Sequence, residues 1–229
     1  MLSVKDIDVY YGRAKVLHSV SLEMNKGEMV FVIGRNGAGK TTLLKTISGV
    51  MHPAKGSIVY EGEEISHVPV EKLALKGIHY VAQDKKVFAG LTVRGNIELA
   101  AYGAGEDLTQ AIDKVTSIYP KLREFLDAKA GGLSGGQREI LLIGRALVGD
   151  PKLLLIDEPT EGLAAVVIED IFRILNQMKA RVSAIIVEQN LATVSRLADR
   201  VYIMKEGKIE RVITDRAEIS DTAALECYL

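Results

Sequence analysis

Residues 34–41 read Gly34-Arg35-Asn36-Gly37-Ala38-Gly39-Lys40-Thr41 and match the pattern Gly-x-x-x-x-Gly-Lys-Ser/Thr of phosphate-binding loops. The loop follows an apolar run, 29–33, and precedes a helix-favouring run, so it joins a strand to a helix. Glycines let successive backbone N–H groups turn toward phosphate oxygens, Lys40 neutralises phosphate charge, and Thr41 can bind Mg²⁺. We expect residues 35–42, ending at Thr42, to bind ATP. The alternative is a Gly-rich turn that only caps a helix.

The segments around this loop predict a β-rich opening. Strands are expected at 2–11, 20–24 and 29–33, with a turn at 25–28 before the third. Beyond the loop we expect a helix over 41–50 and strands over 57–61 and 78–82.

The second half of the chain predicts helices followed by buried strands. Residues 92–148 favour helix, with a break at 103–105 and a loop at 128–133. The runs 152–156 and 183–187 are almost wholly apolar, as in parallel strands that are buried on both faces. Apolar residues at helical spacing lie between these two runs. The alternation predicts an α/β fold with a parallel sheet and crossover helices.

Two adjacent carboxylates, Asp157 and Glu158, end the first of these apolar strands. Parallel sheets bind ligands at the carboxyl ends of their strands, so both side chains are expected at the phosphate site. Asp157 would bind Mg²⁺ directly or through water, and Glu158 would deprotonate the attacking water. The alternative is an ordinary acidic turn.

A second Gly-rich turn, Leu133-Ser134-Gly135-Gly136-Gln137, opens an apolar helix. Ser134 is a predicted N-cap, and the exposed backbone donors could hold an anion. The turn has neither a lysine nor a metal-binding acid of its own, which suggests that another chain completes the site. The alternative is a simple helix cap.

Composition limits the function classes further. The 229 residues include 48% hydrophobic and 26% charged residues, as in a globular protein with a sizeable core. The net charge of -1 argues against a nucleic-acid partner held by bulk charge. Neither a membrane-length apolar run nor a signal-peptide core is present, so we expect a cytoplasmic chain. The single cysteine, Cys227, cannot form an internal disulfide.

These motifs, in this order along the whole chain, resemble the nucleotide-binding subunits of ABC transporters. The resemblance implies a P-loop NTPase with a RecA-like, mainly parallel core (1–90 and 150–229), an N-terminal antiparallel β part and an inserted helical subdomain (91–149), all in one domain. It implies head-to-tail pairing, in which residues 134–137 of one subunit complete the ATP site of a second. Tyr11 matches the aromatic residue that stacks on adenine; the alternative is a half-buried strand tyrosine. Gln83 matches the family's coupling glutamine, which implies contact with nucleotide and Mg²⁺.

Two positions depart from the general family pattern. Gln189 stands where a histidine usually contacts the γ-phosphate, and Ala164 stands where an aspartate is frequent. Both departures resemble the ATPases of branched-chain amino acid importers, which implies a catalytic contribution from the Gln189 amide. Ala165 replaces the usual proline of that branch, and Gln83 replaces its frequent glutamate, so the solute stays open.

The resemblance implies an ATPase docked on the cytoplasmic face of the cell membrane, against separate permease subunits, with a solute-binding protein as an indirect partner. Residues 83–96 are the expected permease contact, through Val87, Phe88 and Leu91; core packing is the alternative for these three. A lipid or polysaccharide exporter ATPase, or a soluble non-transport ABC protein, are the alternative functions. Direction of transport and homo- or heteromeric pairing stay open.

Overall fold

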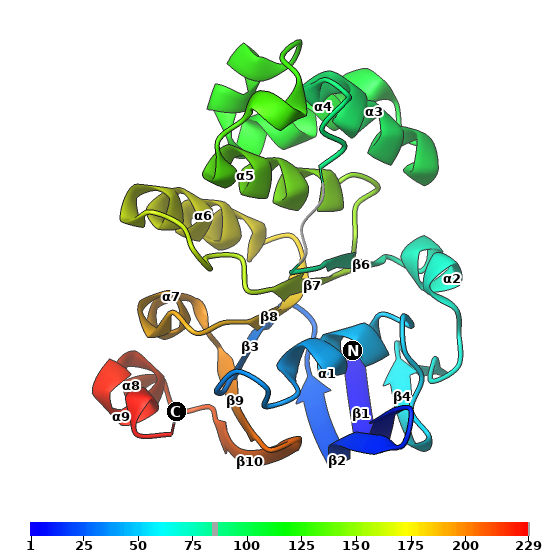
Figure 1. Cartoon of the computed structure of the whole chain (residues 1–229), viewed down its shortest axis with the longest axis vertical. Helices are drawn as coiled ribbons and strands as arrows, with labels where there is room; N and C mark the ends of the chain where they lie inside the picture. The colour runs from blue at the N-terminus through cyan, green and yellow to red at the C-terminus, as the bar shows by residue number, and fades with distance from the viewer. Residues whose placement is uncertain (84–86, 229) are drawn as a thin grey trace.

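The computed structural model describes residues 1–83 and 87–228 and contains two sheets with helices around them (Figure 1). The four-stranded sheet has the order β2-β1-β4-β5, and the six-stranded sheet has the order β10-β9-β3-β8-β7-β6. The strands are β1 (Leu2–Tyr11), β2 (Ala14–Met24), β3 (Met29–Ile33), β4 (Lys55–Tyr60), β5 (Glu63–Glu64), β6 (Ile78–Val81), β7 (Leu153–Asp157), β8 (Ser183–Val187), β9 (Arg200–Lys205) and β10 (Lys208–Ile213).

Parallel pairing dominates the six-stranded sheet, as the sequence predicts. β3 pairs in parallel with β8 and β9, and β7 pairs in parallel with β8 and β6; only β10 is antiparallel to its neighbour. Every residue of β3, β7 and β8 is buried. This burial on both faces explains their almost continuous apolar sequences.

The antiparallel sheet begins earlier in its second strand than the sequence predicts. β2 starts at Ala14 instead of residue 20, and its pairing with β1 is irregular between residues 4 and 10 of β1. Ser19 adopts a left-handed φ of 50°, and its backbone N–H donates to Asp8 Oδ1 at 2.8 Å. This irregularity interrupts the apolar alternation, which is why the pattern hides the first half of the strand.

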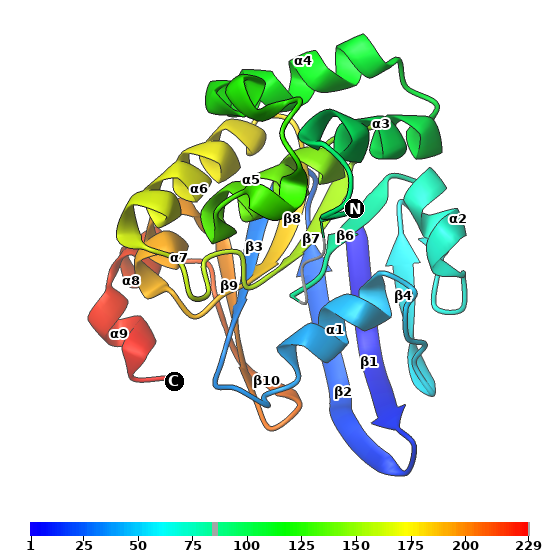
Figure 2. The same ribbon diagram turned by 45° about the horizontal axis from the view of Figure 1, so that its top comes forward.

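The helices are α1 (Lys40–Ile47), α2 (Val70–Leu75), α3 (Val93–Ala104), α4 (Leu108–Ile118), α5 (Gly135–Ala146), α6 (Ala165–Met178), α7 (Leu191–Leu197), α8 (Arg216–Ser220) and α9 (Thr222–Glu226), with short 3₁₀ turns at Pro120–Phe125 and Ala130–Gly132. α3, α4 and α5 gather above the sheet core (Figure 2). α1 ends three residues before the predicted end at residue 50, because Gly49 adopts a φ of 76°. The predicted break at 103–105 is where α3 ends: the helix reaches Ala104, and Gly105, at a φ of 67°, caps it.

Two apolar cores lie on the two faces of the six-stranded sheet. Met29, Phe31 and Ile33 of β3 pack with apolar residues of α3 to α7, whereas Val30 and Val32 pack with β1, β2 and α1. The alternation along a single strand therefore attaches the helical part to one face and the antiparallel sheet to the other.

None of the helices in residues 1–83 and 87–228 combines the length and the apolar composition of a membrane span.

Candidate active site

Three loops meet at the carboxyl edge of the six-stranded sheet. Val32, Val187 and Asp157 are paired across β3, β8 and β7, so the segments that follow these strands begin side by side. Those segments carry the phosphate-binding loop, Glu158 and Gln189. The parallel register thus brings together residues that are far apart in the sequence.

The phosphate-binding loop has a backbone that suits a phosphate chain. A Cβ on Gly34 would lie 2.1 Å from the Met204 carbonyl oxygen, so a side chain does not fit there. Gly37 and Gly39 have left-handed φ values of 80° and 104°. α1 then begins without a side-chain cap, which leaves the N–H groups of its first turn available to an anion.

Lys40 extends back over this loop. Its Nζ donates to the carbonyl oxygens of Gly34, at 2.8 Å, and Arg35, at 3.2 Å, and lies 3.4 Å from Glu158 Oε1. The side chain is 4% exposed. A buried ammonium group held by carbonyls can meet phosphate oxygens without first being desolvated, so the residues present fit the phosphates of ATP.

Asp157 is fully buried beside the start of α1. It accepts hydrogen bonds from Thr41 Oγ1 at 3.2 Å and from Tyr80 OH at 3.3 Å. Burial raises the pKa of Asp157, an effect that the nearby Glu158 carboxylate reinforces and that the Thr41 hydroxyl opposes. The described residues contain no group of three or more His, Cys, Asp or Glu that could hold a metal. The adjacent oxygens of Thr41 and Asp157 instead fit Mg²⁺ shared with phosphate.

Glu158 is held from three directions. Gln189 Nε2 donates to its Oε1 at 2.8 Å, and Gln83 Nε2 donates to its Oε2 at 3.0 Å, while Lys40 lies beside it. Its backbone has a left-handed φ of 50°, uncommon for a glutamate, and its N–H donates to the Val187 carbonyl oxygen at 3.0 Å. The carboxylate is thus fixed beside the phosphate-binding loop, where a general base would stand.

Gln189 also reaches the phosphate-binding loop, because Nε2 donates to Asn36 Oδ1 at 2.8 Å. Its backbone position depends on Glu188, which is 2% exposed. Glu188 Oε2 accepts the N–H groups of Gln189 and Asn190, and Oε1 accepts the hydroxyl and N–H of Thr160. A buried glutamate thereby ties together the segments that follow β7 and β8.

Sequence reasoning missed four residues of this site: Tyr80, Thr160, Glu161 and Glu188. Gln83 Nε2 donates to Glu161 Oε2 at 3.0 Å as well as to Glu158. The structure therefore brings Gln83 to the carboxylates of Glu158 and Glu161. A glutamate directly after the buried strand 183–187 was a signal that could have identified Glu188.

The second Gly-rich turn belongs to α5, in the helical part of the molecule, and not beside α1 (Figures 1 and 2). Ser134 and Gln137 form a reciprocal capping box: Ser134 Oγ accepts the Gln137 N–H, and Gln137 Oε1 accepts the Ser134 N–H. A Cβ on Gly136 would lie 2.4 Å from Val167 Cγ1 of α6, whereas a Cβ on Gly135 would meet open space. The turn is rigidly held but does not join the phosphate-binding loop of its own chain.

Tyr11 lies at the exposed end of β1 and is 49% exposed, next to Gly12 at a φ of 58°. Tyr10 is similarly exposed, with Lys15 Nζ 6.0 Å from its ring centre. Tyr11 is thus accessible from solvent, whereas Lys15 lies over the ring of Tyr10.

The three apolar residues of the predicted permease contact differ in burial. Val87 packs against the core, while Phe88 and Leu91 are 46% and 41% exposed. Residues 84–86 of that region lie outside the described residues.

Comparison with known proteins identifies the family. A family model described as ABC transporter matches residues 17–161. The chain is 42% identical to the high-affinity branched-chain amino acid transport ATP-binding protein BraG of Pseudomonas aeruginosa, over 100% of this chain and 99% of that protein. It is 32% identical to the lipopolysaccharide export system ATP-binding protein LptB of Haemophilus influenzae, over 100% and 97%.

The fold agrees with these matches. MJ1267, an ATP-binding cassette of an ABC transporter, superimposes with a TM-score of 0.87 at 31% identity and covers 100% of this chain and 98% of that one. The expected fold class, a P-loop NTPase with an α/β core, is confirmed. The chain belongs to the ABC transporter family, in which it is an ATP-binding and ATP-hydrolysing subunit.

Proposed function

We propose that this ATPase powers the uptake of a branched-chain amino acid, or a closely related small solute, through separate permease subunits. The observation that carries the proposal is the Gln189 amide on the Glu158 carboxylate, at 2.8 Å, where most of the family has a histidine. The same departure, together with Ala164, relates the chain to the importer branch. Identity to BraG over the whole chain supports the same assignment.

The hydrolytic step follows from the groups around Glu158. The loop 35–42 and Lys40 would hold the ATP phosphates, with Tyr11 against the adenine. Mg²⁺ would be held by Thr41, Asp157 and Gln83, and when bound it neutralises phosphate charge. Glu158 takes a proton from the attacking water, while the Gln189 amide, a non-titrating donor, orients that carboxylate or the γ-phosphate.

A second ATP-binding subunit would complete each site. Residues 134–137 are fixed by a capping box in the helical part, away from the phosphate-binding loop of the same chain. Head-to-tail pairing would place this turn, with Ser134 and Gly136, over the ATP of the partner. We propose this arrangement for a single-domain cassette, residues 1–229, with the helical subdomain at 91–149.

The permease would contact a face formed by α2, α3 and the segment that follows residue 86. The exposed apolar residues of this face include Leu75 (82% exposed) and Tyr102 (87%), together with Val70, Phe88, Leu91 and Leu99. A cleft of about 640 Å³ between α2, α3 and α5 lies on it, lined by Val70, Ala100 and Leu142 among others. Exposed apolar residues of this kind are typical of protein contacts. We therefore place the subunit at the inner face of the cell membrane, with the solute-binding protein as an indirect partner and no nucleic acid.

The test is transport by the assembled complex. The chain, purified with its own permease, is placed in vesicles, and ATP-driven uptake of leucine, isoleucine and valine is measured against an unrelated sugar. Uptake of these amino acids, lost in the matched Glu158→Gln complex, is the expected result. Movement of a lipid or lipopolysaccharide instead, the activity named for LptB, would contradict the proposal. Copurification with ribosomes or DNA and without a permease would contradict it as well.

A further inference from the structure

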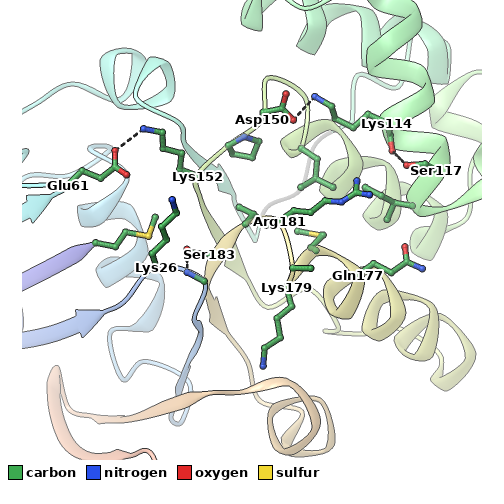
Figure 3. Close-up of a pocket in the computed structure, with 18 residues that line it drawn as sticks. Lys26, Glu61, Lys114, Ser117, Asp150, Lys152, Gln177, Lys179, Arg181 and Ser183 are labelled. Carbon is green, nitrogen blue, oxygen red and sulfur yellow. Dashed lines mark hydrogen bonds and ion pairs between the residues drawn. The ribbon is translucent and has the colours of Figure 1, made fainter.

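A cleft of about 840 Å³ lies at the opposite edge of the six-stranded sheet from Glu158 (Figure 3). Lys152, just before β7, and Ser183, the first residue of β8, line it, whereas Asp157 and Glu158 stand at the other end of β7. The cleft is therefore separate from the hydrolytic site, and its walls come from both α4 of the helical part and the start of the β core.

The floor of this back cleft is apolar. Leu147, Met178 and Val182 line it and are 8%, 2% and 5% exposed, and the partly buried Ile118 of α4 adds to the same surface. A volume of this size, with an apolar floor and polar groups at the rim, is typical of a site for a small organic molecule.

The rim carries more positive than negative charge. Five basic side chains line the cleft against two acidic ones, although the whole chain has a net charge of -1. Both acids are already paired: Asp150 with Lys114 at 2.8 Å, and Glu61 with Lys152 at 2.8 Å. The hydrogen bond from Lys152 holds the pKa of Glu61 below its ordinary value, so this carboxylate stays charged and paired.

In the described part of the chain, two other cations at the rim are not in ion-pair contact with a carboxylate, although Lys26 lies near enough to Glu61 to favour its charged form. Within residues 1–83 and 87–228, neither Lys26 nor Arg181 forms an ion pair with a carboxylate, and both side chains are exposed. Figure 3 shows them on different sides of the cleft: Lys26 extends beside Lys152, and Arg181 extends toward the wall that carries Ser117. The two charges therefore mark two ends of one apolar floor.

The backbone beneath each cation is fixed. Gly27 N donates to Ser183 Oγ at 2.8 Å, which ties the turn that carries Lys26 to β8. Arg181 N donates to the Met178 carbonyl oxygen at 2.8 Å, directly after α6. Fixed positions reduce the entropy that a ligand must overcome on binding.

We propose that the back cleft binds an elongated organic dianion, with an apolar middle on the floor and a negatively charged group at each end, one on Lys26 and one on Arg181. The two separated cations select a ligand that is charged at both ends. The apolar floor between them selects against a compact, fully hydrated anion such as inorganic phosphate.

The test is a calorimetric titration of the full-length chain with linear dicarboxylates from hexanedioate to decanedioate. The expected result is a Kd of about 1 mM or lower for the member with the best length. The monocarboxylate of the same length should bind about 10-fold more weakly, and the uncharged diol more weakly still, because each charged end contributes separately.

Two variants test whether Lys26 and Arg181 each bind one charged end of the dicarboxylate. Lys26→Gln and Arg181→Gln should each weaken the dicarboxylate about 10-fold and bring it to the level of the monocarboxylate. Lys5→Gln, an exposed strand lysine outside the cleft, is the matched control and should leave binding unchanged. Because both cations lie outside the hydrolytic site, ATP turnover without the ligand should stay at the wild-type value in all three variants. Circular dichroism establishes that the variants are folded.

Either of two results would overturn this proposal. One is the lack of binding by every dicarboxylate at several millimolar; the other is binding that survives loss of both cations. Neither result bears on ATP hydrolysis or on the permease, which are tested by turnover and transport.

Discussion

Gln189 Nε2 lies 2.8 Å from both Glu158 Oε1 and Asn36 Oδ1, so one amide joins the candidate general base to the phosphate-binding loop. A histidine could make similar contacts, but its charge would change near neutral pH, whereas an amide does not titrate. The substitution therefore preserves the connection and removes its pH dependence.

Gln189→Ala should lower ATP turnover roughly 10- to 100-fold, because a hydrogen bond to a charged group is worth about 1.5 to 3 kcal/mol. The ratio of wild-type to variant turnover should stay constant between about pH 6 and pH 8. Turnover at saturating ATP, with assembled permease, measures this ratio. A ratio near one would mean that Gln189 makes no contribution to turnover. A ratio that changed steeply with pH would show that a titrating group acts in place of the amide.

Asp157→Asn should raise the melting temperature of the nucleotide-free protein at pH 7. Burial raises the pKa of Asp157, so its charged form is penalised in the folded state. The gain should be full above the raised folded pKa, should shrink as pH falls through that value, and should vanish below the ordinary value of 3.8, where the folded and unfolded carboxyls are both protonated.

Asp8→Asn is the control, for which the expected change in melting temperature has the opposite sign. The hydrogen bond from Lys15 lowers the pKa of Asp8, so its charged form stabilises the fold at neutral pH. This variant should melt at a lower temperature at pH 7, with a difference that fades as pH falls through the lowered pKa. Thermal unfolding scans over pH 3 to 7 measure both variants. If the rise in melting temperature of Asp157→Asn did not change with pH, its cause would be packing and not the charge of Asp157.

Gly136→Ala should destabilise the nucleotide-free chain by about 1 to 3 kcal/mol, the usual cost of overpacking. The added methyl group would stand 2.4 Å from Val167 Cγ1 and force α5 away from α6. Gly135→Ala, one residue earlier in open space, is the matched control and should fold with unchanged stability. Urea unfolding measures both. Val167→Ala in the Gly136→Ala background should restore stability; failure to do so would mean that the contact between α5 and α6 is not the cause.

Lys40→Ala should reduce ATP turnover about 100-fold or more, because the buried ammonium group is preorganised beside the phosphate-binding loop. Initial rates of phosphate release measure the loss, and unfolding curves check that the two bonds to Gly34 and Arg35 are not needed for folding. Turnover at the wild-type rate would mean that the loop only caps α1 and takes no part in ATP hydrolysis.

The sequence predicted the parts of this molecule that local patterns encode. The loop 34–41, the buried runs of β7 and β8 and the Asp157–Glu158 pair each combine a residue pattern with a local conformation, and the structure has all three. The boundaries of β2 were missed because a left-handed Ser19 interrupts its alternation, which periodicity does not reveal.

The partners of the site residues were less predictable. Gln83 meets Glu158 across 75 residues of sequence, and Glu188 meets Thr160 across 28. Such pairs depend on the order of strands in the sheet, and that order becomes visible only in three dimensions. Motifs therefore predicted Asp157 and Glu158 as site residues, but not the buried carboxylate of Glu188 and the hydroxyl of Thr160, which position the loops around them.

The central claim is that Glu158, held by Gln83 and Gln189 beside Lys40, is the general base that takes a proton from the water attacking ATP. The most direct measurement is single-turnover hydrolysis by Glu158→Gln, paired with a titration of Mg-ATP binding to the same protein. The amide has nearly the same size but cannot take a proton from water, so we predict wild-type ATP affinity with hydrolysis slowed about 100-fold or more, since about 100-fold is the lower end of the usual contribution of a general base. Wild-type affinity together with wild-type hydrolysis would contradict the claim.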